Sequence, residues 1–186
     1  VGTDDGNVQL TQDGGTTWTN LIKNIKGAPS GAWVTQIQAS TYDAAEAFVV
    51  INNYRREDWG LYIYRTKDYG KSWSQVADAS QVWGYGLSIV QDPIAPDLMF
   101  LGTEFGLYVT IDGGTNWTQW TEGFPTVSTM DLIIQPTAHD LVIGTFGRSA
   151  YVMDDIRPLR ALAQNGIQQL DEPLTVYEPV TAYLAI

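Results

Sequence analysis

Aromatic and charged residues crowd together in the segment Asn52–Gly60, where they could form a ligand site. Two flat rings flank or lie among four consecutive charged side chains, and the six residues are Tyr54, Arg55, Arg56, Glu57, Asp58 and Trp59. Flat rings beside charged hydrogen-bonding groups suit a sugar ring, which has apolar C–H faces and a rim of hydroxyls. The alternative is a solvated loop with internal charge pairs, because loops are polar in most proteins. From the residues alone we prefer this second interpretation.

Other candidates lie in connections that we expect on the same side of the molecule. Trp33, Trp83 and Tyr85 could extend an aromatic surface, although such residues more often seal a contact between two sheets. Glu104 and Arg148 follow equivalent Gly-Thr elements, and we expect them to pair with each other across adjacent sheets.

No complete catalytic constellation is legible, so the catalytic residues are left unassigned. Glycoside hydrolysis needs two carboxylates about 5–10 Å apart, and the candidates are Glu57, Asp58, Glu104 and Asp131. Phosphate-binding loops, histidine metal motifs and Ser-His-Asp signatures are absent from the sequence. We therefore expect no metal and no cofactor, and we interpret the single histidine, His139, as a solvated turn residue.

A pattern Thr-x-Asp-x-Gly-x-x-Trp occurs three times, at Thr11–Trp18, Thr66–Trp73 and Thr110–Trp117. Each copy lies between short runs of β-branched and aromatic residues, so it predicts a hairpin turn. The Asp accepts hydrogen bonds from nearby backbone N–H groups, the Gly adopts a positive φ, and the Trp begins the next strand. The shared residues are Asp13, Gly15, Trp18, Asp68, Gly70, Trp73, Asp112, Gly114 and Trp117. We interpret them as structural rather than catalytic.

Strands and turns alternate along the chain in units of up to four antiparallel strands. The first unit lacks an innermost strand and comprises Val1–Thr3, Val8–Gln12 and Trp18–Ile22. The second comprises Val34–Ser40, Ala47–Asn52, Leu61–Thr66 and Trp73–Val76, and the third Leu87–Gln91, Leu98–Thr103, Leu107–Ile111 and Trp117–Trp120. The fourth comprises Ser128–Gln135, Leu141–Thr145 and Ala150–Met153. The second unit carries an insertion of about eight residues, Asn52–Gly60, between its second and third strands.

The repeated pattern resembles the Asp-box, or BNR repeat, of β-propeller proteins. The wider resemblance is to the C-terminal blades of secreted bacterial propeller proteins called sortilin-like or glycosyl-hydrolase-type. It is carried by Gly2–Gly6, Thr66–Trp73, Gly102–Tyr108, Asp131–Ile134, Asp140–Ser149 and Met153–Arg160. The resemblance implies an all-β propeller with four-stranded blades and an extracytoplasmic location, whether secreted, periplasmic or on the cell surface.

The region after the strands predicts a different structure. We expect propeller blades over residues 1–155, of which the last is degenerate, and a short helix over 156–164 that begins after Asp155 and has Pro158 in its first turn. Residues 165–186 form either a tail or one more strand. Either further blades complete a larger ring, or this tail supplies the strand that the first unit lacks.

Composition limits the classes of partner. The chain of 186 residues is 44% hydrophobic, which is ample for a packed core. It has 10 Lys and Arg against 21 Asp and Glu, a net charge of −11, so neither duplex nucleic acid nor an anionic membrane is an expected partner. No cysteine is present and no apolar run is long enough for a transmembrane helix, so we expect no membrane insertion.

The leading hypothesis is a binding or assembly module with a protein or glycan ligand, because every strong motif is structural. Its expected partners are the remaining blades of the same polypeptide or of a partner chain. The rival hypothesis is a glycoside-hydrolase-like propeller that cleaves polysaccharide with a carboxylate pair.

Overall fold

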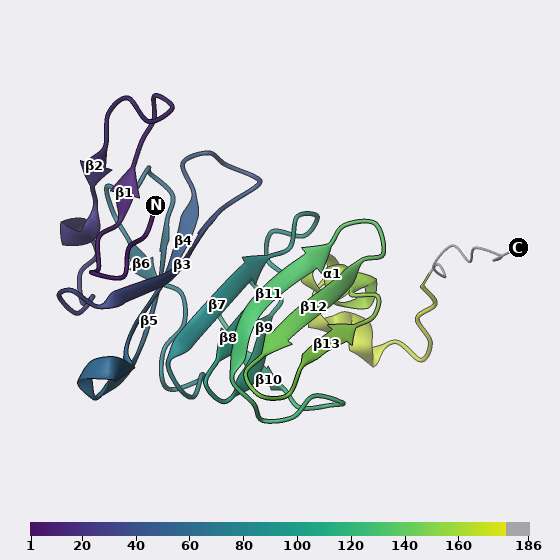
Figure 1. Ribbon diagram of the computed structural model, residues 1–186. Coiled ribbons are helices and arrows are strands. Elements are labelled where there is room, and N and C mark those ends of the chain that lie inside the picture. Colours follow the sequence, from purple (N-terminus) through teal and green to yellow (C-terminus); the bar gives the residue numbers. More distant parts are fainter. Residues whose placement is uncertain (178–186) are drawn as a thin grey trace, which may run out of the picture.

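The computed structural model describes residues 1–177, which form four antiparallel sheets and one short α-helix. Figure 1 shows the sheets in chain order, from the N-terminal strands to the helix behind the fourth sheet. The all-β fold class with a short helix near the C-terminus is therefore confirmed. Residues 178–186, which belong to the predicted tail or extra strand, lie outside the described residues.

Two of the sheets have four strands each. The second sheet has the order β3-β4-β5-β6 and the third has the order β10-β9-β8-β7. Their strands are β3 (Trp33–Ala39), β4 (Ala47–Asn53), β5 (Asp58–Thr66), β6 (Ser74–Gln75), β7 (Gly86–Gln91), β8 (Met99–Thr103), β9 (Gly106–Thr110) and β10 (Thr118–Trp120). Each strand pairs with its neighbour in the sequence, as short hairpin connections require.

The first and fourth sheets are smaller. The first contains β1 (Gln9–Leu10) and β2 (Thr19–Asn20), with a bridge from Gly2 to Val8 beside them. The fourth has the order β11-β12-β13, formed by β11 (Thr129–Gln135), β12 (Asp140–Thr145) and β13 (Ala150–Met153). The remaining elements are the helix α1 (Arg157–Asn165) and three 3-10 helices, η1 (Ile22–Asn24), η2 (Tyr54–Arg56) and η3 (Ile167–Asp171).

The insertion in the second sheet differs from the predicted loop. Strands β4 and β5 extend into it as far as the pair Asn53–Asp58, so only η2 and Glu57 remain outside the ladder. Glu57 adopts a left-handed conformation with φ of 60° and closes the turn. Polar residues hid these strand ends in the sequence, because pairing across the ladder satisfies their backbone groups whatever their side chains are.

The third sheet is buried on both faces because it lies between its two neighbours. All residues of β7, β8 and β9 are buried. One apolar cluster joins its Ile89 and Leu101 to Phe48 and Ile63 of the second sheet, and another joins its other face to the fourth sheet. The fourth sheet, by contrast, alternates: Leu132 faces this core, whereas Ile133 is 64% exposed. The apolar core thus runs between sheets.

Helix α1 packs on the second of these clusters through its side chains and through the preceding Ile156. Its Arg160 is buried and forms an ion pair with Asp92, at 2.8 Å between Nε and Oδ2. Nη1 of Arg160 lies 2.9 Å from Nδ1 of His139, which must accept this hydrogen bond because a guanidinium only donates. The prediction that His139 is a solvated turn residue was therefore wrong, since the ring is half-buried against the helix.

Candidate functional site

The three repeated turns use their Asp side chains in one shared geometry. In the second copy, Oδ1 of Asp68 accepts hydrogen bonds from the Ser72 N–H (2.9 Å) and the Thr66 hydroxyl (2.8 Å), and Oδ2 accepts from the Ser72 hydroxyl (2.6 Å). Asp13 and Asp112 make the equivalent contacts. These hydrogen bonds lower the pKa of Asp68 and of Asp13 to about 2. Carboxylates engaged in this way are poor general acids or bases near neutral pH.

The turns lie at the opposite end of the sheets from the segment that first suggested a ligand site. The Asp turns join β1 to β2, β5 to β6 and β9 to β10, whereas η2 joins β4 to β5. Because antiparallel strands reverse direction at each turn, successive turns fall at opposite ends of a sheet. Figure 1 shows the β1–β2 loop at the top and the ribbon of η2 at the lower left.

The predicted aromatic residues meet at the end that carries η2. Tyr54 and Tyr85, from two different sheets, stack with ring centroids 4.9 Å apart and an interplanar angle of 17°. Trp59 joins them, with its ring centroid 6.4 Å from Tyr54 and 5.9 Å from Tyr85. Tyr54 and Tyr85 are half-buried and Trp59 is 57% exposed. The residue pair that sequence spacing could not connect is thus one aromatic stack.

Arg55 extends this stack toward Trp33. Its guanidinium carbon lies 4.1 Å from the centroid of the Trp33 ring and 5.8 Å from that of Tyr54, which is cation–π geometry. The neighbouring Arg56 donates from Nη1 to the Ser30 carbonyl at 2.7 Å. Within residues 1–177 neither guanidinium has a carboxylate as an ion-pair partner. Two cationic groups therefore border the aromatic stack in a strongly acidic protein.

Beside the stack lies a hollow of about 340 Å³, which we call the inner-strand hollow. It lies where β3, β7 and β11 approach one another, at the end of the sheets that carries η2. Its lining residues are Trp33, Thr35, Tyr54, Tyr85, Leu87, Ser128, Met130 and Phe146. Aromatic and aliphatic side chains dominate this set, and only Thr35 and Ser128 bring side-chain hydroxyls apart from the tyrosines. None of these lining residues carries a carboxylate.

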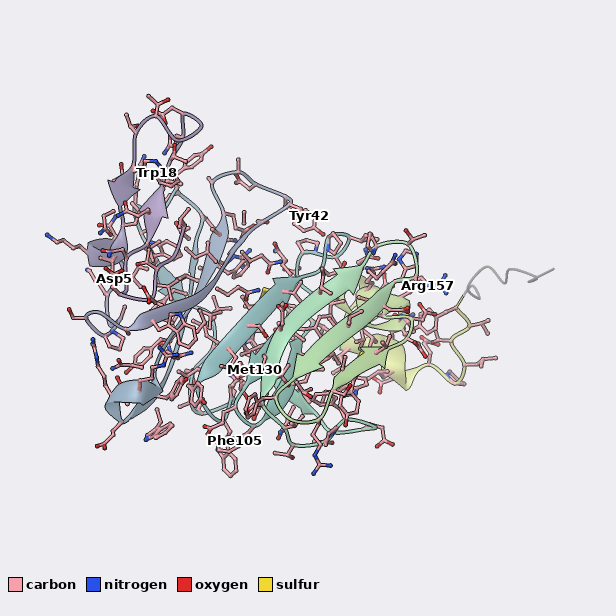
Figure 2. The ribbon with its side chains drawn as sticks, viewed as in Figure 1. Asp5, Trp18, Tyr42, Phe105, Met130 and Arg157 are labelled. Carbon is pink, nitrogen blue, oxygen red and sulfur yellow. The ribbon has the colours of Figure 1, made fainter. Side chains whose placement is uncertain are left out.

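Several of these lining residues were not predicted. Thr35, Leu87, Ser128, Met130 and Phe146 come from three sheets and are distant in sequence, so nothing in their spacing joins them. Phe146 carried one usable signal, since it follows a Gly-Thr element, as does Phe105 in the third sheet. Both phenylalanines are exposed, and Figure 2 shows Phe105 extending from the sheets at the end remote from Trp18.

The acidic candidates occupy separate places around this end. Asp58 is engaged, because it accepts hydrogen bonds from Asn53 (2.9 Å), Tyr62 (3.0 Å) and the Gly60 N–H (3.1 Å), and the bond from Asn53 is the main cause of its lowered pKa. Glu57 is exposed on the turn after η2. Asp58 therefore helps to shape the turn.

Glu104 and Arg148 do not form the predicted ion pair, and neither has an ion-pair partner in the described part of the chain. Burial, and next the charge of Glu104, raise the pKa of Tyr85, so Glu104 lies close to the aromatic stack. Arg148 is exposed beside Phe146. The pairing prediction was wrong because equivalent turns of adjacent sheets splay apart.

Two further candidates lie outside the hollow. Trp83 is 70% exposed, and its backbone N–H donates to the Tyr108 hydroxyl at 3.1 Å. Asp131 is exposed on β11, where Oδ1 accepts a hydrogen bond from the Leu132 N–H at 2.9 Å. Neither residue lines the hollow.

Across residues 1–177, no group of three or more His, Asp or Glu side chains has the geometry of a metal site. In the same part of the chain, no helix is both long and apolar enough to cross a membrane.

Solved structures resemble this arrangement of sheets. A GH74 enzyme from Niastella koreensis superimposes on 82% of the chain with a TM-score of 0.64 and 19% sequence identity, and a GH74 xyloglucanase from Xanthomonas campestris on 83% with 0.63 and 17%. YCF48 bound to the D1 peptide matches 83% of the chain with a TM-score of 0.54 and 21% identity. The chain folds as β-propeller blades.

These likenesses establish the fold alone. The chain spans 26% and 27% of the length of the two GH74 enzymes and 48% of that of YCF48. No protein-family model matches the sequence, and no curated protein matches it either.

Proposed function

We propose that this chain is a ligand-binding module of an extracytoplasmic β-propeller, and that its ligand occupies the inner-strand hollow. The observation that carries the proposal is the convergence of Tyr54, Tyr85 and Trp33 from two sheets on one hollow, with Arg55 against the rings. Concave, mostly apolar sites with a few polar groups are typical ligand sites. Asp-box turns at the other end of the blades would hold this surface in place.

The chemistry of the hollow favours a polypeptide over a glycan. A sugar presents many hydroxyls that need directional partners, whereas this hollow offers mainly rings, Leu87 and Met130. A methionine thioether adapts to varied apolar partners, which suits peptide side chains. An acidic group on the ligand would complement Arg55 or Arg56, neither of which has a carboxylate partner among the described residues. We therefore propose an extended segment with apolar and acidic side chains as the ligand.

The alternative function is glycoside hydrolysis, which the likeness to GH74 enzymes keeps in view. It would require two carboxylates across one cleft. The candidate carboxylates belong to the β4–β5 turn, the β8–β9 turn and strand β11, and none lines the hollow. These placements favour binding over hydrolysis.

The proposal also extends to partners and relatives. The sortilin-like resemblance, the extracytoplasmic location and the association with further blades, in the same polypeptide or a partner chain, form one consistent hypothesis. Its support is the repeated Asp-box geometry together with a fold that resembles part of longer propellers.

Peptide selection tests the function directly. A random peptide-display library is selected on the wild-type chain, with xyloglucan oligosaccharides titrated in parallel as the glycan probe. Selected peptides should bind at least tenfold more weakly to Tyr85→Ala, because the substitution removes half of the stacked pair; a tenfold loss corresponds to about 1.4 kcal/mol. The matched control is Tyr69→Ala, an exposed tyrosine on an Asp-box turn at the other end.

The outcomes separate the two ligand classes. Equal binding to wild type and to the folded Tyr85→Ala variant would show that the hollow is not the site. Binding of the oligosaccharides that depends on Tyr85, with no peptide binding, would replace the polypeptide ligand by a glycan.

A further inference from the structure

The first sheet has an unpaired inner edge. Val1 and Gln9 exchange hydrogen bonds of 2.7 and 2.8 Å, and Gly2 bridges to Val8. In an antiparallel pair the groups of successive residues point to alternate sides, so those of Gly2 point away from β1. In the described part of the chain, neither the N–H nor the C=O of Gly2 has a hydrogen-bond partner.

Equivalent strands in two other sheets have a partner at this edge. Gly102 pairs with Ser88 of β7 on one side and with Leu107 of β9 on the other. Gly144 likewise pairs with Asp131 of β11 and with Ala150 of β13. All three glycines belong to the repeated Gly-Thr element. By this equivalence the first sheet lacks the strand that corresponds to β7 and β11.

An apolar groove of about 260 Å³ adjoins this edge. It separates the first sheet from the second and is lined in part by Val1, Val8, Leu10, Ile37, Ala39 and Trp73. Ile37 and Ala39 belong to β3, the innermost strand of the second sheet. Innermost strands of adjacent sheets contact one another elsewhere in this molecule, as β7 and β11 do. The groove therefore lies where the innermost strand of the first sheet would pack against β3.

We propose that this edge and groove bind an added β-strand, supplied by a further propeller sheet. The strand would run antiparallel to Val1–Thr3, pair with Gly2 and place alternate apolar side chains in the groove, as β7 does beside β8. Continuity with the existing contacts between sheets identifies this occupant. The inference rests on the proposed association with further blades, and it names the surface where that association occurs.

A peptide copy of β7 tests this inference. The probe is Gly86–Gln91 with lysines added at both ends for solubility, and the control peptide has proline at the positions of Ser88 and Ile89, which removes two pairing N–H groups. Binding to the 186-residue chain should slow hydrogen exchange at the amides of Gly2 and its neighbours at least tenfold, whereas the proline peptide should give no protection.

Charge placed in the groove provides the matched protein variants. Ala39→Glu adds a carboxylate at an exposed position of the groove and should weaken the β7 peptide at least tenfold, whereas Ala79→Glu, exposed on a distant turn, should not. Tyr85→Ala should also bind the β7 peptide normally, which separates this site from the inner-strand hollow.

Three results would overturn the inference: no protection at Gly2 with saturating β7 peptide, equal protection by the proline peptide, or a dimer in solution whose second copy covers this edge.

Discussion

At the residue scale, the clearest distinction is between carboxylates that shape turns and side chains that remain available. Asp13 and Asp68 each accept several hydrogen bonds within their own turn. Tyr54 and Tyr85, in contrast, hold each other in place by stacking and keep part of their surface exposed. Repetition of a carboxylate therefore indicates structure here, whereas convergence of unrepeated aromatic residues indicates a site.

The first prediction concerns the acid stability of the Asp-box turns. Hydrogen bonds lower the pKa of Asp13 and Asp68 to about 2 from an ordinary 3.8. A lowered pKa stabilises the fold at every pH above the unfolded value, and this contribution is lost as the pH falls from about 4 to about 2. The exchange rate of the Thr17 and Ser72 amides, corrected for its intrinsic pH dependence, should rise in this window.

The matched variant is Asp13→Asn, which has no titrating carboxyl in the first turn. Its Thr17 amide should lose the additional exchange between pH 4 and pH 2, while that of Ser72 keeps it. NMR titration curves for Asp13 and Asp68 with midpoints near 3.8 would contradict the hydrogen-bonded geometry.

At the element scale, the three Asp-box tryptophans have different surroundings although their turns are alike. Trp117 is 7% exposed and donates from Nε1 to the Val76 carbonyl of the preceding sheet at 3.1 Å. Trp18 is 49% exposed, and its Nε1 donates within its own turn to Gly15. The contribution of each tryptophan to stability thus depends on the sheet that precedes it.

A pair of alanine substitutions measures this difference. Trp117→Ala should lower the free energy of unfolding by about 3–5 kcal/mol, because it removes a buried ring and leaves a cavity. Trp18→Ala should cost about 1 kcal/mol or less, as is usual at exposed positions. Urea unfolding of both variants gives the comparison. Equal losses would show that the tryptophans act within their turns rather than between sheets.

Sequence patterns predicted those elements whose causes are local. The Asp-box turns and the strand alternation follow from short-range hydrogen bonds and side-chain period, so both could be read directly. The ends of β4 and β5 could not, because ladder pairing rather than side-chain type extends them to Asn53 and Asp58. His139 was misjudged for a similar reason, since its partner Arg160 lies on the helix that follows the sheets.

At the scale of the whole molecule, the sheets form an arc whose middle is covered and whose ends differ from it. The third sheet is buried on both faces, while the fourth exposes Ile133 and Val152. The inner-strand hollow belongs to no single sheet, and Met130 and Phe146 reach it from the fourth. A site assembled across sheets cannot be located from spacing along the chain, although Tyr54 and Tyr85 were correctly singled out as candidates.

The central claim is that ligand binds at the hollow and not at the Asp-box turns. The most direct measurement is amide hydrogen exchange of the wild-type chain with and without a selected peptide. Our account predicts slowed exchange in residues 54–59, 85–87 and 128–130, with no change in the Asp-box turns at 11–18, 66–73 and 110–117. Slowed exchange in those turns, with the hollow unaffected, would contradict it.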